Sequence, residues 1–173
     1  PPTERPEIDR WALALLHHTV DEATSALEAY DAHRAGQAIE ELIDQLSNWY
    51  IRRNRRRFWK SDAGSDKQSA YLTLYQCLDT LHRLLAPFMP FIAEEMYQNL
   101  VRSRDPDAPL SVHMTQWPQA QPDWSDTALL EATRVVQNIV ALGRSARESS
   151  QVRVRQPLSR LLVRAPSDKV HQA

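Results

Sequence analysis

Glycine is scarce in this chain of 173 residues, which contains only Gly36, Gly64 and Gly143. Folds built from β-strands need many tight turns, and glycine adopts the backbone angles of those turns most easily. So few glycines, so far apart, therefore favour long helices over a sheet. About 42% of the residues are apolar and 25% are charged, which is typical of a folded protein with an interior of its own.

Apolar residues recur at three- and four-residue steps through most of the chain, which is the spacing of one helix face. The expected helices cover residues 5–30, 31–60, 66–86, 90–100 and 126–149. Asp31 and Asp66 can cap the second and third helices, because a short carboxylate accepts hydrogen bonds from the free first-turn amides. Pro87 should end the third helix, whereas Pro90 suits the first turn of the fourth.

Two segments lack a helical pattern. Residues 102–126 contain four prolines and two tryptophans, and they predict a long ordered crossing. Residues 152–155 and 161–164 flank a proline and could form short strands. The predicted fold is therefore all-α: a bundle of four to five helices over residues 1–149, with a short C-terminal appendage that could be β. Residues 150–173 are expected to be the start of a truncated junction segment.

The sequence offers few candidates for catalysis. It has no glycine-rich phosphate loop, no closely spaced histidine pair with a third ligand and no nucleophile elbow. Cys77 is the only cysteine, which excludes an internal disulfide and a multi-cysteine zinc site and fits a reducing compartment. No apolar run approaches the roughly 20 residues that span a bilayer. We therefore expect a cytoplasmic module with no catalytic residue, metal, cofactor or membrane partner of its own.

The run Arg52–Lys60 is the strongest functional signal, with five arginines and a lysine but no acid in a chain of net charge −1. A helix dipole explains one or two such cations, not six. Aromatic residues bracket the run, and arginines beside aromatics suit the phosphates and unstacked bases of single-stranded RNA. The candidate phosphate contacts are Arg52, Arg53, Arg55, Arg56, Arg57 and Lys60, and the candidate stacking side chains are Trp49, Tyr50 and Trp59.

Other interpretations of this run remain open. It could be an ordinary surface that is solvated or paired within the chain, or it could dock on an acidic protein or a membrane surface. Trp49 and Tyr50 also fit the apolar stripe of their helix and could belong to the core.

A second basic stretch lies between Arg144 and Arg164, where Glu148 is the only acid. Arg153 and Arg155 alternate with valines, so on a strand they would project from one side. They form the second set of candidate RNA contacts. Two basic zones in a nearly neutral chain indicate segregated charge, which favours a polyanionic partner.

Several motifs resemble one known family. Residues 85–97 (LAPFMPFIAEEMY) resemble the proline-containing helix junction in the anticodon-binding domains of the synthetases for isoleucine, valine and leucine. Residues 47–50 (SNWY) and 111–118 (SVHMTQWP) resemble landmarks of the isoleucine enzyme. Residues 52–59 (RRNRRRFW) and 154–158 (VRQPL) resemble the branch shared by eukaryotes, archaea and some bacteria. The likeness covers nearly the whole chain with its landmarks in order, although Asn54 stands where a serine is expected.

The resemblance implies the tRNA-holding part of an isoleucine–tRNA ligase, a protein of translation. The family's ATP- and amino-acid-handling motifs, His-Ile-Gly-His and Lys-Met-Ser-Lys-Ser, are absent from the chain, as is a cysteine-rich zinc tail. The implied partners are the anticodon stem-loop of isoleucine tRNA and the catalytic and editing domains of the same parent chain, where ATP is used. The alternatives are the corresponding domain of a valyl- or leucyl-tRNA synthetase, a helical protein-interaction module that binds no RNA, and an enzyme with an unrecognised site.

Overall fold

The computed structural model describes residues 4–59 and 64–164, and within these ranges the chain forms helices and no strand. The all-α prediction is confirmed. The chain divides into two compact units, Pro1–Ser125 and Asp126–Ala173, which are described separately below. The predicted division after residue 149 falls inside the second unit, and as a statement about functional domains it stays a prediction. No helix in the described ranges is both long and apolar enough to cross a membrane.

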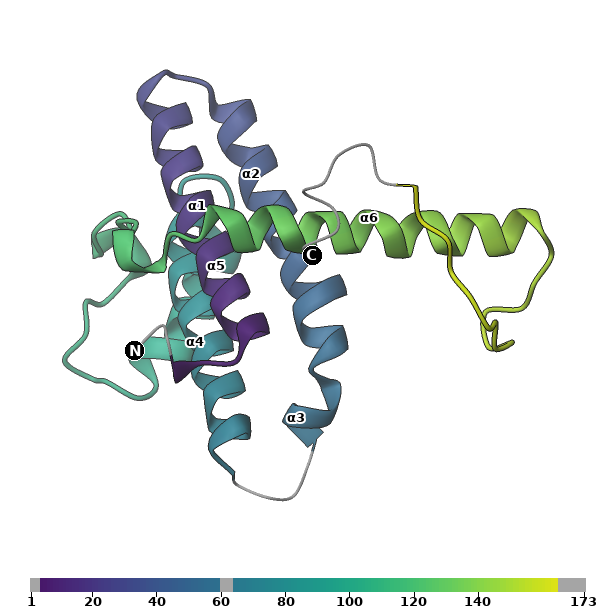
Figure 1. Ribbon diagram of the computed structural model, residues 1–173. Helices are drawn as coiled ribbons and strands as arrows, with labels where there is room; N and C mark the ends of the chain where they lie inside the picture. Colours follow the sequence, from purple (N-terminus) through teal and green to yellow (C-terminus); the bar gives the residue numbers. More distant parts are fainter. Residues whose placement is uncertain (1–3, 60–63, 165–173) are drawn as a thin grey trace. The chain divides into compact units, whose positions relative to one another are not determined.

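The first unit is built on a helical hairpin of α1 (Glu7–Glu28) and α2 (Ala32–Asp44), which lie side by side (Figure 1). The inward face of α2 carries Ala35, Ile39 and Leu42, whose four- and three-residue spacing places them on one side of the helix. Asp31 caps α2 as predicted, because its carboxylate accepts a hydrogen bond of 3.0 Å from the first-turn amide of Arg34.

After Asp44 the second helix widens into a π-helix, η2 (Gln45–Ile51), and then continues through Asn54 into α3 (Arg55–Trp59). The sequence predicted a helical path into the arginines, which is confirmed, but it did not predict the wider turn. A π-helix bonds each amide to the residue five positions back, so it changes the angle at which later side chains leave the axis. Leu46, Tyr50 and Asn54 all point inward from this segment.

The next helix, α4 (Ser65–Leu85), packs against α1 and α5 (Pro90–Tyr97), which is followed by the π-turn η3 (Gln98–Arg102). The end of α4 at Leu85 and the start of α5 at Pro90 confirm the expected proline junction. Tyr71 fits the apolar spacing of α4 but does not lie on its buried face. Thr73 and Cys77 are buried, whereas Tyr71 is 50% exposed.

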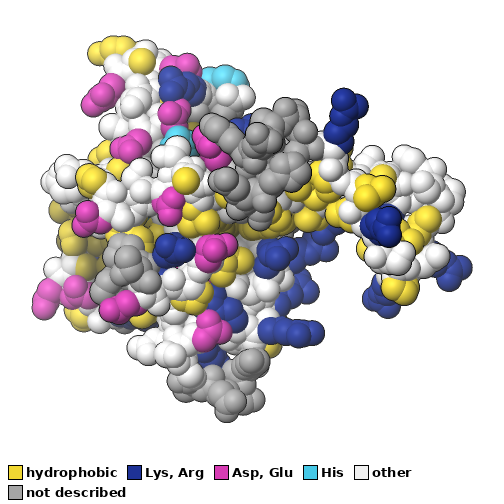
Figure 2. Space-filling view, viewed as in Figure 1, with side chains coloured by type: hydrophobic (Ala, Val, Ile, Leu, Met, Phe, Trp, Pro, Cys, Tyr) yellow, Lys and Arg dark blue, Asp and Glu magenta, His cyan; other side chains and the backbone are white. Residues whose placement is uncertain are grey.

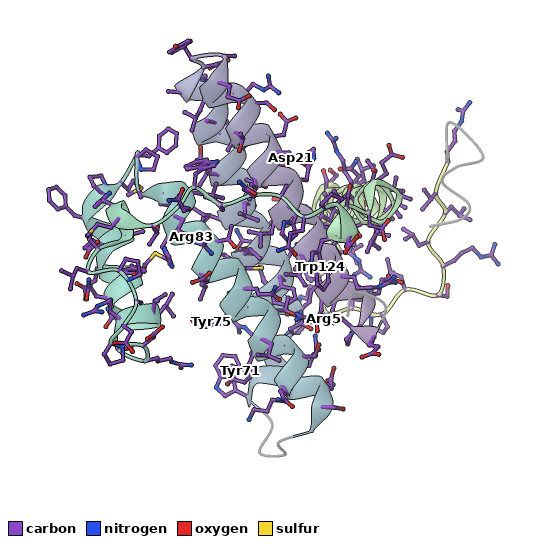
Figure 3. The ribbon with its side chains drawn as sticks, turned by 90° about the vertical axis from the view of Figure 1, so that its left-hand side faces the viewer. Arg5, Asp21, Tyr71, Tyr75, Arg83 and Trp124 are labelled. Atoms are coloured by element: carbon purple, nitrogen blue, oxygen red, sulfur yellow. The ribbon has the colours of Figure 1, made fainter. Side chains whose placement is uncertain are left out.

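The crossing that follows α5 is ordered, as predicted. It contains two short turns, η4 (Val112–Met114) and η5 (Pro122–Trp124). The Glu94 carboxylate of α5 accepts a hydrogen bond of 2.9 Å from the Val112 amide and so holds η4 against the bundle. At η5, the Trp124 ring stacks on His17 of α1 and lies 5.4 Å from the Arg5 guanidinium (Figure 3).

The second unit contains α6 (Thr127–Ser149), which Asp126 caps through a 3.0 Å hydrogen bond from the Leu129 amide. The strands predicted at residues 152–155 and 161–164 are wrong, because residues 150–164 form turns and irregular chain. Arg147 donates hydrogen bonds to the carbonyls of Arg153 and Gln156, which fixes a turn where an extended strand was expected. Two segments this short could at best form an isolated two-stranded pair, which is marginally stable in water.

We expect Leu42→Ala to destabilise the chain by about 2–5 kcal/mol, the usual cost of emptying a buried leucine site. Ile43→Ala is the matched control, because Leu42 is 0% and Ile43 is 37% exposed on the same helix. Unfolding in urea measures both free energies. Equal losses in the two variants would contradict the packing described for α2.

Candidate nucleic-acid interface

A buried carboxylate organises the first unit. Asp9, in the first turn of α1, accepts hydrogen bonds from Tyr50 at 2.8 Å, from Ser69 at 2.7 Å and from both terminal nitrogens of Arg57 at 2.7 and 2.8 Å. These donors belong to η2, α4 and α3 respectively. One side chain therefore connects four elements of the unit, including the segment that carries the arginines.

The hydrogen bonds determine the charge of this carboxylate. Burial alone raises the pKa of Asp9, but the hydrogen bonds from Arg57, Ser69 and Tyr50 outweigh it and hold that pKa below its ordinary value of 3.8. Burial and the neighbouring Asp9 carboxylate both raise the pKa of Tyr50, so its hydroxyl stays protonated and donates. The Asp9 side chain is thus an ionised acceptor surrounded by donors, with Arg57 as its counter-charge.

This network involves two of the predicted RNA contacts. Tyr50 was a candidate for base stacking, but its ring is fully buried and offers no face to a ligand in this structure. Arg57 was a candidate phosphate contact, but its side chain is 13% exposed and also pairs with Asp66 at 2.8 Å. Both side chains hold the bundle together, and we do not retain either as a ligand contact.

The other four described arginines of the run lie outside this network. Arg52, Arg53, Arg55 and Arg56 are exposed, and no ion pair within residues 4–59 and 64–164 involves any of them. Lysine and arginine side chains gather over the segment from η2 to α3 in Figure 2. Lys60, the last predicted phosphate contact, lies outside the described residues. Among the described residues, these four arginines on the surface of η2 and α3 therefore carry positive charge that no acidic side chain pairs with.

Two tryptophans accompany these arginines. Trp59 is 75% exposed at the end of α3, which leaves its ring accessible to a ligand. Trp49 is partly buried on η2, and the Arg53 guanidinium lies 4.6 Å from the centre of its ring. Of the three predicted stacking side chains, the two tryptophans therefore reach the surface. Trp59 is exposed directly, and Trp49 lies beneath an arginine.

The sequence missed an aromatic contribution from α4. Tyr71 packs edge-on against Phe58 of α3 at 5.3 Å, and its hydroxyl donates to the Phe58 carbonyl at 3.2 Å. Tyr71 and Tyr75 lie on the same side of α4 in Figure 3, as their four-residue spacing requires. No local signal could reveal the contact with α3, because Tyr71 also fits the apolar stripe of its own helix.

The second predicted set, Arg153 and Arg155, belongs to the second unit and is exposed. The strand that was to direct both side chains to one side is absent there, so the reason for grouping them does not hold. Their role as RNA contacts stays a prediction.

Other chemistry has little support in the described residues. They contain no group of three or more histidine, cysteine, aspartate or glutamate side chains arranged to hold a metal ion. Burial raises the pKa of the Cys77 thiol to about 12, so this cysteine is not a reactive thiolate at neutral pH.

The fold and the site define a class of protein: an all-α bundle that presents arginines and tryptophans on one exposed helical segment. Residues 9–162 match the family described as the anticodon-binding domain of tRNA ligase, and the chain belongs to that family. This match confirms the resemblance found in the sequence motifs.

The similar proteins are isoleucine–tRNA ligases. The chain is 48% identical over 168 residues to the isoleucine–tRNA ligase of Thermus thermophilus, covering 96% of this chain and 16% of that protein. It is 51% identical over 160 residues to the enzyme of Dehalococcoides mccartyi, covering 92% and 16%. For the enzyme of Thermobifida fusca the identity is 48% over 165 residues, covering 95% and 15%. The chain thus spans about one sixth of the length of these relatives.

We expect Asp9→Asn to destabilise the chain by about 3–5 kcal/mol at pH 7, because it leaves Arg57 without its buried counter-charge. The pKa of Asp9 is depressed in the folded state, so its contribution is complete above pH 3.8 and is lost as the pH falls through the folded-state pKa. The difference between the native chain and Asp9→Asn should therefore shrink below about pH 4.

Urea unfolding at about pH 7 and about pH 2.5 measures this difference, with Asp21→Asn, an exposed position on the same helix, as the control. The control should stay within about 0.5 kcal/mol of the native chain. A difference for Asp9→Asn that is as large in acid as at neutral pH would disprove the ionised network.

Proposed function

We propose that this domain binds the anticodon stem-loop of isoleucine tRNA as part of an isoleucine–tRNA ligase. The observation that carries the proposal is the exposed set of Arg52, Arg53, Arg55 and Arg56, none of which forms an ion pair within residues 4–59 and 64–164, in a chain that belongs to the anticodon-binding family. The isoleucine enzymes among its relatives support the choice of tRNA.

The chemistry of the surface suits the single-stranded loop of an RNA stem-loop. Phosphates of a loop take up hydrogen bonds from guanidinium groups and release bound counterions as they do so. Bases that leave the stack need flat partners, which Trp59 and the Trp49–Arg53 pair provide at the edges of the basic segment. Arg57 contributes indirectly, since its ion pair with Asp9 fixes α3 against α1 and α4.

The contribution of this domain is recognition and alignment. Holding the anticodon arm places the distant acceptor end of the tRNA at the catalytic domain of the parent chain, where ATP activates the amino acid. The domain itself needs no cofactor for this task. Its other partners are the catalytic and editing domains of the parent, and the compartment is the cytoplasm, where translation takes place.

Replacing Arg52, Arg55 and Arg56 together by glutamine should weaken binding of the stem-loop and flatten its salt dependence. Each lost phosphate contact removes roughly 0.7–0.9 from the slope of log affinity against log salt concentration. Fluorescence titration of a labelled isoleucine anticodon stem-loop at several salt concentrations measures the slope.

The matched control replaces Arg34, Arg104 and Arg134 by glutamine, since these exposed arginines lie outside the basic run and their loss changes the net charge equally. An equal loss of slope in both triple variants would contradict the assignment of the surface. A native chain that binds a scrambled loop as tightly as the isoleucine loop would instead favour a helical module for acidic partners.

A further inference from the structure

Trp49 and Arg53 form a cation–π pair where the π-helix ends, with the guanidinium over the ring. Four residues separate them, so their side chains meet on one side of the helix. The Arg53 guanidinium carbon lies 4.6 Å from the centre of the Trp49 ring, inside the roughly 6 Å range of a cation–π contact. Trp49 is partly buried and Arg53 is exposed, so the ring lies inside and the guanidinium outside.

The backbone beneath this pair is firmly held. Tyr50, next to Trp49, is anchored by its hydrogen bond to Asp9. Asn54, next to Arg53, is buried and bonds to the Tyr50 carbonyl twice, through its amide at 3.1 Å and its side chain at 2.8 Å. The residues beside the pair are thus fixed to the interior, which limits how far Trp49 and Arg53 can move.

The open side of the pair is a planar cation without an acidic partner. No ion pair in the described parts of the chain involves Arg53, and the other exposed side chains nearby in the run, Arg52, Arg55 and Arg56, are also cations. A guanidinium with one face on an indole has its opposite face left for another flat group. Arginine suits this use because it is planar and weakly hydrated, whereas a lysine ammonium has no face.

We propose that the Trp49–Arg53 pair is a base-stacking platform, on which one unstacked base of the RNA loop lies against the outer face of the Arg53 guanidinium. This inference rests on the proposed function and deepens it. Arg53 is the contact, and Trp49 is a positioning residue that holds the guanidinium flat from below. Arg52, Arg55 and Arg56 remain the phosphate contacts, since no aromatic ring within the described residues lies under their guanidinium groups.

A stacked base and a bound phosphate make opposite demands on the side chain at position 53. A phosphate needs the charge and tolerates lysine, while a base needs the flat face and does not. Arg53→Lys should therefore weaken binding about 5- to 150-fold, the range that corresponds to losing one stacking side chain, and leave the salt slope unchanged. Arg52→Lys is the matched control and should change the affinity less than twofold.

The test uses the complete parent protein, the isoleucine anticodon stem-loop and a set of the same RNAs with one loop base removed at a time. The native protein should bind one of these abasic RNAs more weakly than the intact loop, by the same factor by which Arg53→Lys weakens binding of the intact loop. Arg53→Lys should lose nothing further on that RNA, because the partner of the missing base is already gone. Trp49→Leu should also lose affinity for the intact loop and lose nothing further on that abasic RNA. If Trp49→Leu folds poorly, the result for Arg53→Lys alone tests the platform.

Arg53→Lys within twofold of native affinity, or an equal further loss for Arg53→Lys on every abasic RNA, would overturn the platform. Both results leave the proposed function intact as long as the native salt slope still depends on Arg52, Arg55 and Arg56. An acidic peptide that binds equally well to native protein and Arg53→Lys, with no preference of the native protein for the isoleucine loop, would overturn the platform and the proposed function together.

Discussion

The first unit depends on one buried negative charge. The Asp9 carboxylate is fully buried, and it is stable there only because Tyr50, Arg57 and Ser69 surround it with donors. Those donors come from the helices that must be brought together to form the bundle. The contacts of Asp9 with Tyr50 and Arg57 fix the end of η2 and α3. The positions of the exposed arginines therefore depend on the ion pair of Arg57, the arginine that faces inward.

The basic run therefore has two tasks divided among its residues. Arg57 turns inward and is largely shielded, while Arg52, Arg53, Arg55 and Arg56 remain exposed. The helix geometry separates them, because Leu46, Tyr50 and Asn54 occupy the inward row and the arginines leave on other sides. A run of identical charges thus supplies a structural ion pair and, in the proposed function, a surface for a polyanion.

Much of this organisation was predictable from local chemistry. The three-to-four-residue spacing, the Asp31 cap and the Pro87–Pro90 junction identified the helices of the bundle, because each acts within a few residues along the chain. The apolar stripe allowed a core position for Tyr50, but the shared partner of Tyr50 and Arg57 was not predictable, since Asp9 lies 41 and 48 residues earlier. The C-terminal strands were wrong because alternating valines fit the pleat of a strand but do not supply a neighbouring strand to pair with.

We propose that the segment from η2 to α3 faces the RNA with its outer arginines, while Arg57 faces the protein interior. Arginine modification by phenylglyoxal, read by mass spectrometry with and without the isoleucine anticodon stem-loop, tests it directly. We expect Arg52, Arg53, Arg55 and Arg56 to react in the free protein and to be protected by RNA. Arg57 should react poorly in both states, and Arg34, at the other end of α2, equally in both. Protection of Arg34 with unchanged reactivity of Arg52, Arg53, Arg55 and Arg56 would contradict this orientation of the segment.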